Sequence, residues 1–293
     1  MKLLGAQDLE QETKGSAFDT SGEGTPLHFE FAQEDFQRVR ELIHQMAGIS
    51  LSPAKRDMVY SRLARRLRAR GMQNFTEYLD YLVQGDVQEI EAFINALTTN
   101  MTSFFREPHH FRILADRLAE QRDSTVSIWT CASSTGEEPY SIAITVLEAL
   151  KSYRHQPRIL ATDIDTNVLA TARRGVYPLD QLAKLPAEQL RRFFLKGEGK
   201  NQGFARVRDE VKQLVSFKRL NLLEETWPMR GRFDFIFCRN VMIYFDKPTQ
   251  YALLKRLAGY LKPHGLLFVG HSESFHHASD LFQICGNTMY TLK

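Results

Sequence analysis

Apolar residues recur at helical spacing through the first third of the chain. Four successive stretches place them three or four residues apart, which is the pattern of amphipathic helices. Gly48 ends the first stretch, Ser52-Pro53 is a helix-start signal for the second, and Gly71 follows its end at about Arg70. The apolar positions are Phe36, Val39, Ile43 and Met46; Met58, Leu63 and Leu67; Phe75, Tyr78, Leu79 and Leu82; and Ile90, Phe93, Ile94 and Leu97. We therefore expect an all-α domain over residues 28–100.

The pattern changes after a linker that we place at 101–123. Short β-branched or apolar runs now alternate with helical stretches, which predicts an α/β domain with a doubly wound parallel sheet over 124–293. The runs are 126–130, 159–162, 233–238 and 266–269, and the helical stretches are 140–150, 167–174 and 249–261. A Gly-rich, alternating segment at about 194–217 predicts a small antiparallel insertion. Residues 1–27 are rich in small and polar residues and are expected to form a mobile tail.

Composition narrows the class of protein. Hydrophobic residues make up 43% of the chain, enough for a sizeable core, and the formal net charge is only +3. No apolar run approaches the roughly 18 residues that span a bilayer, so we expect no membrane insertion. Cys131, Cys238 and Cys285 are widely spaced and odd in number, which excludes a paired disulfide framework. Each lies in an apolar stretch, so we expect three buried thiols in a cytoplasmic protein.

Polar residues follow the first two predicted strands, where an open α/β sheet binds its ligands. Thr135 and Glu138 have the spacing of a capping box, which leaves Glu137 free to face a ligand. Asp163 stands at the end of the second strand, where a carboxylate can accept both ribose hydroxyls of a nucleoside. Asp165 can instead cap the helix that follows. The sequence therefore predicts a nucleoside-type site at this edge of the sheet.

Further polar residues follow the later strands. Asn221 can read an adenine edge through its amide, or serve only in turn chemistry. A buried run ends in Arg239-Asn240, and Tyr244 follows four residues later. The segment that precedes the sheet contributes Asn100, Thr102 and Arg106. We expect Arg239 and Asn240 at the ligand edge of the sheet, whereas a lone arginine such as Arg106 is more often a solvated surface residue than a ligand clamp.

The second predicted helix is strongly basic. Residues 55–70 carry seven bases against one acid, Asp57. Like charges at helical spacing repel one another, so we expect an anionic partner rather than a merely solvated face. Nucleic acid and anionic lipid both meet that requirement. The bases are Lys55, Arg56, Arg62, Arg65, Arg66, Arg68 and Arg70.

Five stretches, taken in order, closely resemble the CheR family of chemotaxis-receptor methyltransferases. They are INALTTNMTSFFRE (94–107), ASSTGEEPYSIAI (132–144), ATDIDTNVL (161–169), FDFIFCRNVMIYFD (233–246) and LKPHGLLFVGHSE (261–273). The resemblance covers about residue 31 to the C-terminus. It implies a Rossmann-like, S-adenosylmethionine-dependent methyltransferase domain with a small antiparallel β-subdomain, preceded by an all-α domain. It also implies methylation of glutamate side chains on membrane chemoreceptors, with S-adenosylhomocysteine as the second product.

The resemblance assigns roles to individual residues. Arg106 and Tyr244 are expected to act at the reacting groups, Arg106 by holding a carboxylate of either the cofactor or the substrate. Glu137 is expected to bind the methionyl ammonium and Asp163 the ribose. The residues implied in cofactor binding are Asn100, Thr102, Arg106, Glu137, Asp163, Asn221, Leu222, Arg239 and Asn240. Those expected to dock the acidic methylation helices of the receptor are Lys55, Arg56, Arg62, Arg65 and Arg66.

The insertion offers a second contact with the receptor. An exposed edge strand can add an extended peptide to its sheet. The Gly-rich turn at 196–203 resembles that of family members whose β-subdomain binds a peptide at the receptor's C-terminus. We therefore expect such a tether peptide as a possible second ligand.

The expected chemistry needs no general base, because a glutamate with a pKa near about 4.3 is already ionised at neutral pH. A nucleic-acid methyltransferase is the alternative enzyme, but the motif for an aromatic-lined base pocket is missing. A cofactor-binding sensor without activity would not need both Arg106 and Tyr244. The pairs His109-His110 and His276-His277 suggest metal binding, but no third ligand is spaced nearby, so we expect no metal.

Overall fold

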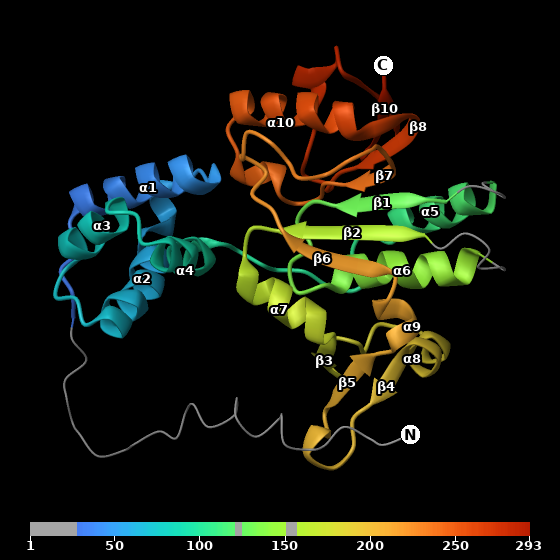
Figure 1. Cartoon of the computed structure of the whole chain (residues 1–293), viewed down its shortest axis with the longest axis horizontal. Helices are drawn as coiled ribbons and strands as arrows, with labels where there is room; N and C mark the ends of the chain where they lie inside the picture. The colour runs from blue at the N-terminus through green and yellow to red at the C-terminus, as the bar shows by residue number, and fades with distance from the viewer. Residues whose placement is uncertain (1–27, 121–124, 151–156) are drawn as a thin grey trace.

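The computed structural model describes residues 28–120, 125–150 and 157–293, so the expected tail at 1–27 lies outside the described residues. Four helices form the N-terminal all-α domain, at the left of Figure 1, as predicted. They are α1 (Gln33–Ala47), α2 (Arg56–Arg70), α3 (Phe75–Val83) and α4 (Val87–Leu97), with a short 3-10 turn, η1 (Pro53–Lys55), before α2. Gly48 and Gly71 end the first two helices in left-handed conformations, with φ of 69° and 66°.

The apolar stripes of these helices meet in a single core. Val39 and Ile43 of α1, Leu63 of α2 and Phe93 of α4 are fully buried, as the helical spacing predicted. Asn74 caps α3 by accepting a hydrogen bond from the backbone N–H of Glu77, and Asp86 caps α4 in the same way. The domain therefore has its own core and its own helix caps.

A seven-stranded sheet forms the centre of the second domain, with the strand order β6-β2-β1-β7-β8-β10-β9. The first five strands in this order run parallel, whereas β10 is antiparallel to both of its neighbours. The expected parallel sheet therefore ends in an antiparallel hairpin, because no helix separates β9 from β10. The strands are β1 (Ser127–Thr130), β2 (Arg158–Asp163), β6 (Val215–Arg219), β7 (Phe233–Phe237), β8 (Leu261–Phe268), β9 (Phe282–Gly286) and β10 (Met289–Leu292).

Each face of the sheet is covered by helices. Along β1 and β7 alternate side chains enter opposite cores: Ile128 and Phe235 face one core, and Trp129 and Ile236 face the other. Helices α5 (His109–Glu120), α6 (Glu137–Ala149) and α7 (Thr166–Arg174) supply the first core, and α10 (Lys247–Tyr260) supplies the second. Helix α5 lies inside the segment 101–123 that we expected to be a linker. Among the described helices, none combines the length and apolar character needed to cross a bilayer.

A three-stranded antiparallel sheet projects below the larger one in Figure 1. Its order is β3-β5-β4, from β3 (Val176–Pro178), β4 (Phe194–Lys196) and β5 (Phe204–Val207), with α8 (Ala187–Phe193) before β4 and the short α9 (Asp209–Lys212) after β5. The insertion therefore starts before the expected 194–217, and β6 belongs to the main sheet. The three-residue strand β3 ends in a proline, so its pattern was too short to be seen.

The three cysteines do not share one environment. Cys131 and Cys238, at the ends of β1 and β7, are buried as predicted. Cys285 is exposed, so the expectation of a third buried thiol was wrong. It lies in β9, the edge strand of the sheet, where a side chain has fewer neighbours.

Candidate active site

The carboxyl ends of the parallel strands and the loop between α1 and α2 enclose a cavity of about 470 Å³, a volume typical of small-molecule sites. The loop supplies residues 49–52 of its wall, so the helical domain forms one side of the site. The predicted site residues that line it are Asn100, Thr102, Arg106, Asp163, Asn221, Leu222, Arg239, Asn240 and Tyr244. Glu137 does not line this cavity, whereas Lys55 does.

Asp163 ends β2 and is only 7% exposed. Its two carboxylate oxygens each accept one backbone N–H, from Ser134 at 2.8 Å and from Asp165 at 2.9 Å. Burial raises the pKa of Asp163 to about 6, although both N–H groups favour the ionised form. A carboxylate offers about four acceptor positions, so Asp163 keeps acceptor capacity for hydroxyl groups of a ligand.

Asp165 connects the helical domain with the end of β2. It caps α7 by accepting N–H bonds from Asn167 at 2.9 Å and Val168 at 3.3 Å. Its other oxygen accepts bonds from Thr98 Oγ1 and Asn100 Nδ2, both at 2.8 Å. The amide of Asn100 is therefore held in the cavity wall by a helix cap.

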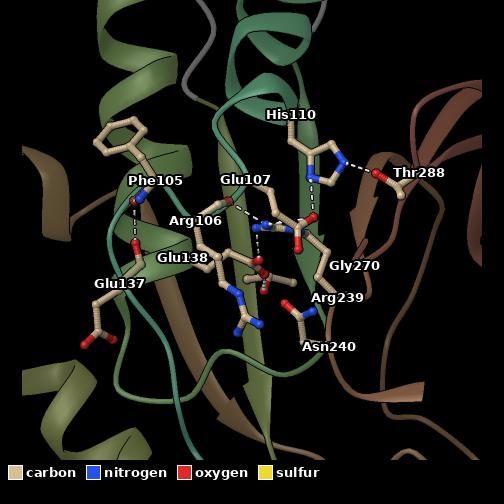
Figure 2. A network of polar contacts seen from close by, with 12 residues as sticks. Phe105, Arg106, Glu107, His110, Glu137, Glu138, Arg239, Asn240, Gly270 and Thr288 are labelled. Atoms are coloured by element: carbon tan, nitrogen blue, oxygen red, sulfur yellow. Dashed lines mark hydrogen bonds and ion pairs between the residues drawn. The ribbon is translucent and has the colours of Figure 1, made fainter. Parts of the chain in front are cut away.

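A strained turn carries Arg106. The residues on either side of it, Phe105 and Glu107, have φ of 51° and 58°, a left-handed region that costs a non-glycine residue about 1 kcal/mol or more. The N–H of Phe105 donates to Ser141 Oγ at 2.9 Å, which ties the turn to α6. Figure 2 shows the Arg106 side chain leaving this turn toward the side where Asn240 lies. The turn therefore aims a guanidinium into the cavity.

Arg239 holds that turn from below (Figure 2). Its guanidinium is buried and donates from Nη1 to Glu138 Oε2 at 2.6 Å and from Nη2 to the carbonyl of Arg106 at 2.5 Å. Nη2 also lies 3.4 Å from Glu107 Oε2. The side chain of Arg239 is only 1% exposed, and both of its identified hydrogen bonds go to protein groups, which favours a role in positioning Arg106 over the direct cofactor contact that we expected.

The expected capping box at the start of α6 is wrong. Gly136, with φ of 102°, is the N-cap, and Glu138 accepts bonds from Arg239 and from Thr130 Oγ1. Thr135 Oγ1 instead donates to Glu137 at 2.7 Å. Burial raises the pKa of Glu137, with the Thr135 bond acting against it. Arg239 and Thr130 bind Glu138 in place of the helix end, and Glu137, which accepts one bond from Thr135, does not line the cavity.

Asn221 joins the two domains. Its Nδ2 donates to the carbonyl of Met46 at 2.8 Å, and its Oδ1 accepts the N–H of Leu223 at 3.0 Å. Both polar atoms of the amide therefore have partners, so the side chain serves turn chemistry and domain closure. The backbone of Asn221 and the apolar side chain of Leu222 are what this segment offers to a ligand base.

Tyr244 and Arg106 line the same cavity from different segments. Tyr244 lies in η3 (Met242–Tyr244), and its carbonyl accepts the N–H of Ser50 from the α1–α2 loop at 2.8 Å. Burial raises the pKa of Tyr244, which the charge of Arg106 partly opposes. The phenol is therefore protonated at neutral pH and can donate a hydrogen bond to a carboxylate.

Sequence reasoning missed the roles of three acids with little exposure that organise this site: Glu107, Glu138 and Glu273. Each bonds to groups far along the chain; Glu138 had been placed in a capping box, and Glu107 and Glu273 were visible only as members of the quoted motifs. Glu107 lies between Arg239 and His271, which contacts Glu107 Oε1 at 3.1 Å. Burial would raise the pKa of Glu107, but Arg239 and His271 lower it overall.

Glu107 also corrects the reasoning about metal. Its carboxylate lies within 4.8 Å of ligand atoms of His109 and His110, so a third group is nearby after all. The positive charge of Arg239 beside the same carboxylate opposes a cation there. His110 is fully buried, its Nε2 lies 2.8 Å from Thr288 Oγ1, and burial lowers its pKa to about 3. This pattern favours a neutral core histidine.

Two arginines of α2 form ion pairs within the helical domain, and two others bond to its backbone carbonyls. Glu89, fully buried on α4, accepts bonds from Arg66 Nε and Nη2 at 2.9 and 2.7 Å and from Arg70 Nε at 2.5 Å. Arg62 donates to the carbonyls of Ala96 and Thr98, and Arg56 to that of Phe31. Glu89, which lies beyond the helix that we considered, therefore removes Arg66 and Arg70 from the argument for an external anion.

Replacing Glu89 by alanine is expected to lower the free energy of unfolding by about 3–5 kcal/mol, because two arginines and Tyr78 lose a buried partner. Burial would raise the pKa of Glu89, but bonds from Arg66, Arg70 and Tyr78 lower it overall. The stabilisation is therefore present above the unfolded pKa of about 4.3 and lost as pH falls through the folded value. Urea unfolding tests this, with the exposed Glu41→Ala as control; a loss below about 1 kcal/mol would contradict it.

Comparisons with known proteins agree with this architecture. Residues 34–98 match the family described as "CheR methyltransferase, all-alpha domain", and residues 100–291 match "CheR methyltransferase, SAM binding domain". "Chemotaxis protein methyltransferase 2" of Pseudomonas aeruginosa is 54% identical over 265 residues, covering 90% of this chain and 94% of the relative.

Two further relatives are each called "Chemotaxis protein methyltransferase". That of Salmonella typhimurium is 52% identical over 258 residues, covering 88% of this chain and 89% of its own. That of Escherichia coli is 50% identical over 258 residues, covering 88% of this chain and 90% of its own. The matched segments span both domains and include every residue that lines the cavity except Thr99. The chain therefore belongs to the CheR methyltransferase family, and its second domain is an S-adenosylmethionine-binding methyltransferase domain.

Proposed function

We propose that this protein transfers the methyl group of S-adenosylmethionine to glutamate side chains of chemoreceptors in the cytoplasm, forming glutamyl methyl esters in sensory adaptation. The observation that carries this proposal is one cavity that combines an acidic strand end, Asp163, with Arg106 and a protonated Tyr244. The family membership and the names of the relatives support the same reaction.

The residues of the cavity suit the cofactor. Asp163 keeps acceptor capacity for the two ribose hydroxyls, and Leu222 and the neighbouring backbone form an apolar slot for the adenine. Glu137 is buried beside the site and lies outside the cavity, so we assign no ammonium contact to its present rotamer. When bound, S-adenosylmethionine supplies an electrophilic methyl group on a positively charged sulfur.

The protein's own contribution is to place the acceptor carboxylate. A glutamate is ionised at neutral pH, so the site needs no base. Arg106 can hold a carboxylate, of the cofactor or of the substrate, and the Tyr244 hydroxyl can donate to the accepting glutamate. The transfer removes the positive charge of the sulfonium and the negative charge of the accepting glutamate. Excluding water from around these two charges favours the transfer. The α1–α2 loop, which lines the cavity, helps to exclude this water.

The direct test is transfer of tritiated methyl groups from S-adenosylmethionine to receptor-containing membranes. We expect incorporation that is released as methanol by mild base, as an ester requires. Membranes whose receptors carry glutamine at the accepting positions are the matched control and should remain unlabelled. Base-stable label, or equal labelling of both membranes, would refute carboxylate methylation. Labelling of added DNA or RNA would favour the nucleic-acid alternative.

The docking surface is narrower than the sequence suggested. Of the five residues expected to bind acidic receptor helices, Arg56, Arg62 and Arg66 have partners inside the helical domain. Lys55 lines the cavity and Arg65 is exposed on α2. We propose that these two approach the acidic surface of the receptor, with Lys55 nearest the reacting carboxylate.

Charge reversal by Arg65→Glu is expected to slow receptor methylation about 3- to 10-fold at low salt, because rim charges act mainly on association. The affinity for S-adenosylhomocysteine should not change. Arg158→Glu, an exposed site at the amino end of β2, is the matched control with the same change of charge. Equal rates for the two variants at low ionic strength would remove Arg65 from the docking surface.

The small sheet offers a site for the tether peptide. Among the described residues, no strand pairs with the outer edges of β3 and β4. Phe204 and Leu195 are exposed on this sheet, at 43% and 37%. An extended peptide can add to such an edge while apolar side chains contact exposed rings. We propose this sheet as the second receptor contact.

A further inference from the structure

Glu273 is a buried acid that none of the roles above explains. It follows β8 in the segment 269–275 and is only 6% exposed. Four backbone N–H groups donate to it: Val241 and Met242 to Oε1 at 3.0 and 2.8 Å, and Asn240 and Gly270 to Oε2 at 2.9 and 2.6 Å. Three of these donors are consecutive, which makes a backbone nest around one carboxylate.

The three consecutive donors belong to the turn that leaves β7. This turn begins at Asn240, which follows Arg239 (Figure 2), and leads to Tyr244 in η3. Asn240 has φ of 57°, a conformation that a non-glycine residue keeps only when its surroundings impose it. The bond from its N–H to Glu273 is one such constraint. Both Asn240 and Tyr244 line the cavity.

Gly270 supplies a second constraint on the same turn. A side chain on Gly270 would collide with the amide of Asn240 and would come within 2.9 Å of Glu273 Oε2. The absence of a side chain therefore lets Asn240, Gly270 and Glu273 pack together. Strands β7 and β8 are parallel neighbours, so this packing joins their two carboxyl ends.

The carboxylate of glutamate fits this position better than the neutral side-chain amide of glutamine would. All four partners are donors, and an ionised carboxylate accepts at both oxygens, whereas glutamine would turn an N–H₂ group toward two of them. Burial raises the pKa of Glu273, but the four N–H groups act against that rise. The same charge also acts on the phenol of Tyr244, whose pKa it helps to raise.

We propose that Glu273 is a positioning residue for methyl transfer: it holds the Asn240–Met242 turn so that Asn240 and Tyr244 face the cofactor. The proposal rests on the cofactor occupying this cavity, as in the proposed function. Glu273 itself does not line the cavity, so it acts through the turn and touches no reacting atom.

The test uses the full-length protein with Glu273→Gln. We expect S-adenosylhomocysteine affinity, measured by calorimetry, and kcat for receptor methylation each to fall about tenfold, at a temperature where the variant is fully folded. Asp234→Asn is the matched control, because Asp234 accepts a backbone N–H near the amino end of β7, whereas Glu273 holds the turn at its carboxyl end. It should lower the unfolding temperature and leave affinity and kcat unchanged.

A double-mutant cycle separates positioning from general stability. If Glu273 acts through the turn, adding Tyr244→Phe to Glu273→Gln should lower kcat less than the product of the two single effects. Multiplied effects, or affinity and kcat within twofold of wild type, would overturn the proposal. If Glu273→Gln fails to fold, Gly270→Ala displaces the same turn with Glu273 intact and should give the same tenfold losses.

The two proposals can fail separately. Cofactor affinity is measured without any acceptor, so a wild-type protein that labels no receptor would refute the proposed substrate. A tenfold loss of affinity in Glu273→Gln would still support the role of Glu273 in that case.

Discussion

Asp163→Ala is expected to weaken binding of S-adenosylhomocysteine on the order of 100-fold, which corresponds to about 3 kcal/mol. The reason is that two ribose hydroxyls lose their acceptor. Each of these hydrogen bonds contributes roughly 1.5–3 kcal/mol when the acceptor is charged. Two backbone N–H groups, of Ser134 and Asp165, would also lose their partner. Isothermal calorimetry at neutral pH measures the change directly.

The raised pKa gives this interaction a pH dependence. With a pKa of about 6, Asp163 is largely protonated at pH 5 and largely ionised at pH 7. The ionised form accepts hydroxyl hydrogens better, so affinity should rise with pH through about 6 and level off above it. Asp163→Asn has no such titration, and its affinity should be low and flat over the same range.

A second aspartate provides the control. Asp246 caps α10 at the same edge of the sheet but does not line the cavity. Asp246→Ala should cost about 1 kcal/mol of stability, as for a lost helix cap, and leave cofactor affinity unchanged. If Asp163→Ala binds as tightly as Asp246→Ala, then the assignment of the ribose to Asp163 is wrong.

Local signals made much of the fold predictable. Gly48 and Gly71 end helices because their positive φ depends on little beyond the residue itself. The place of Asp163 in the cavity wall was predictable for a related reason. A carboxylate at the carboxyl end of a buried parallel strand lies at the ligand edge of the sheet, whatever the rest of the chain does. These features are encoded within a few residues of one another.

The errors concern contacts that are distant in sequence. The bond between Arg239 and Glu138 spans 101 residues, and that between Arg66 and Glu89 spans 23. No spacing rule within one helix or strand could have paired these charges. Arg66 and Arg70 were therefore counted among the bases in need of an external anion, and Glu138 looked like part of a capping box. A sequence reveals which charges exist, but packing decides which of them are neutralised.

Arg239→Ala is expected to lower the free energy of unfolding by about 3–5 kcal/mol, because Glu107 and Glu138 would remain buried without their cation. Their side chains are only 10% and 11% exposed, so water replaces the guanidinium poorly. The strained turn at Arg106 would also lose the bond to its carbonyl. Receptor methylation should fall by at least 100-fold, since a misplaced catalytic group forfeits much of the gain from orientation.

Arg239→Lys separates the charge from the shape of the side chain. Lysine restores the positive charge but cannot reach Glu138, Glu107 and the Arg106 carbonyl with one fork of donors. We expect this variant to recover most of the stability and little of the methylation. If activity returns along with stability, then charge alone is sufficient and the turn does not depend on the guanidinium.

Comparison with Arg106→Ala decides whether Arg239 binds the cofactor or positions Arg106. A positioning residue loses its effect once Arg106 is absent, so Arg106→Ala/Arg239→Lys should be no slower than Arg106→Ala alone. A direct ligand would instead lower the rate again in the double variant. The geometry favours the first outcome, because the donors of Arg239 with identified partners bond to Glu138 and to the Arg106 carbonyl.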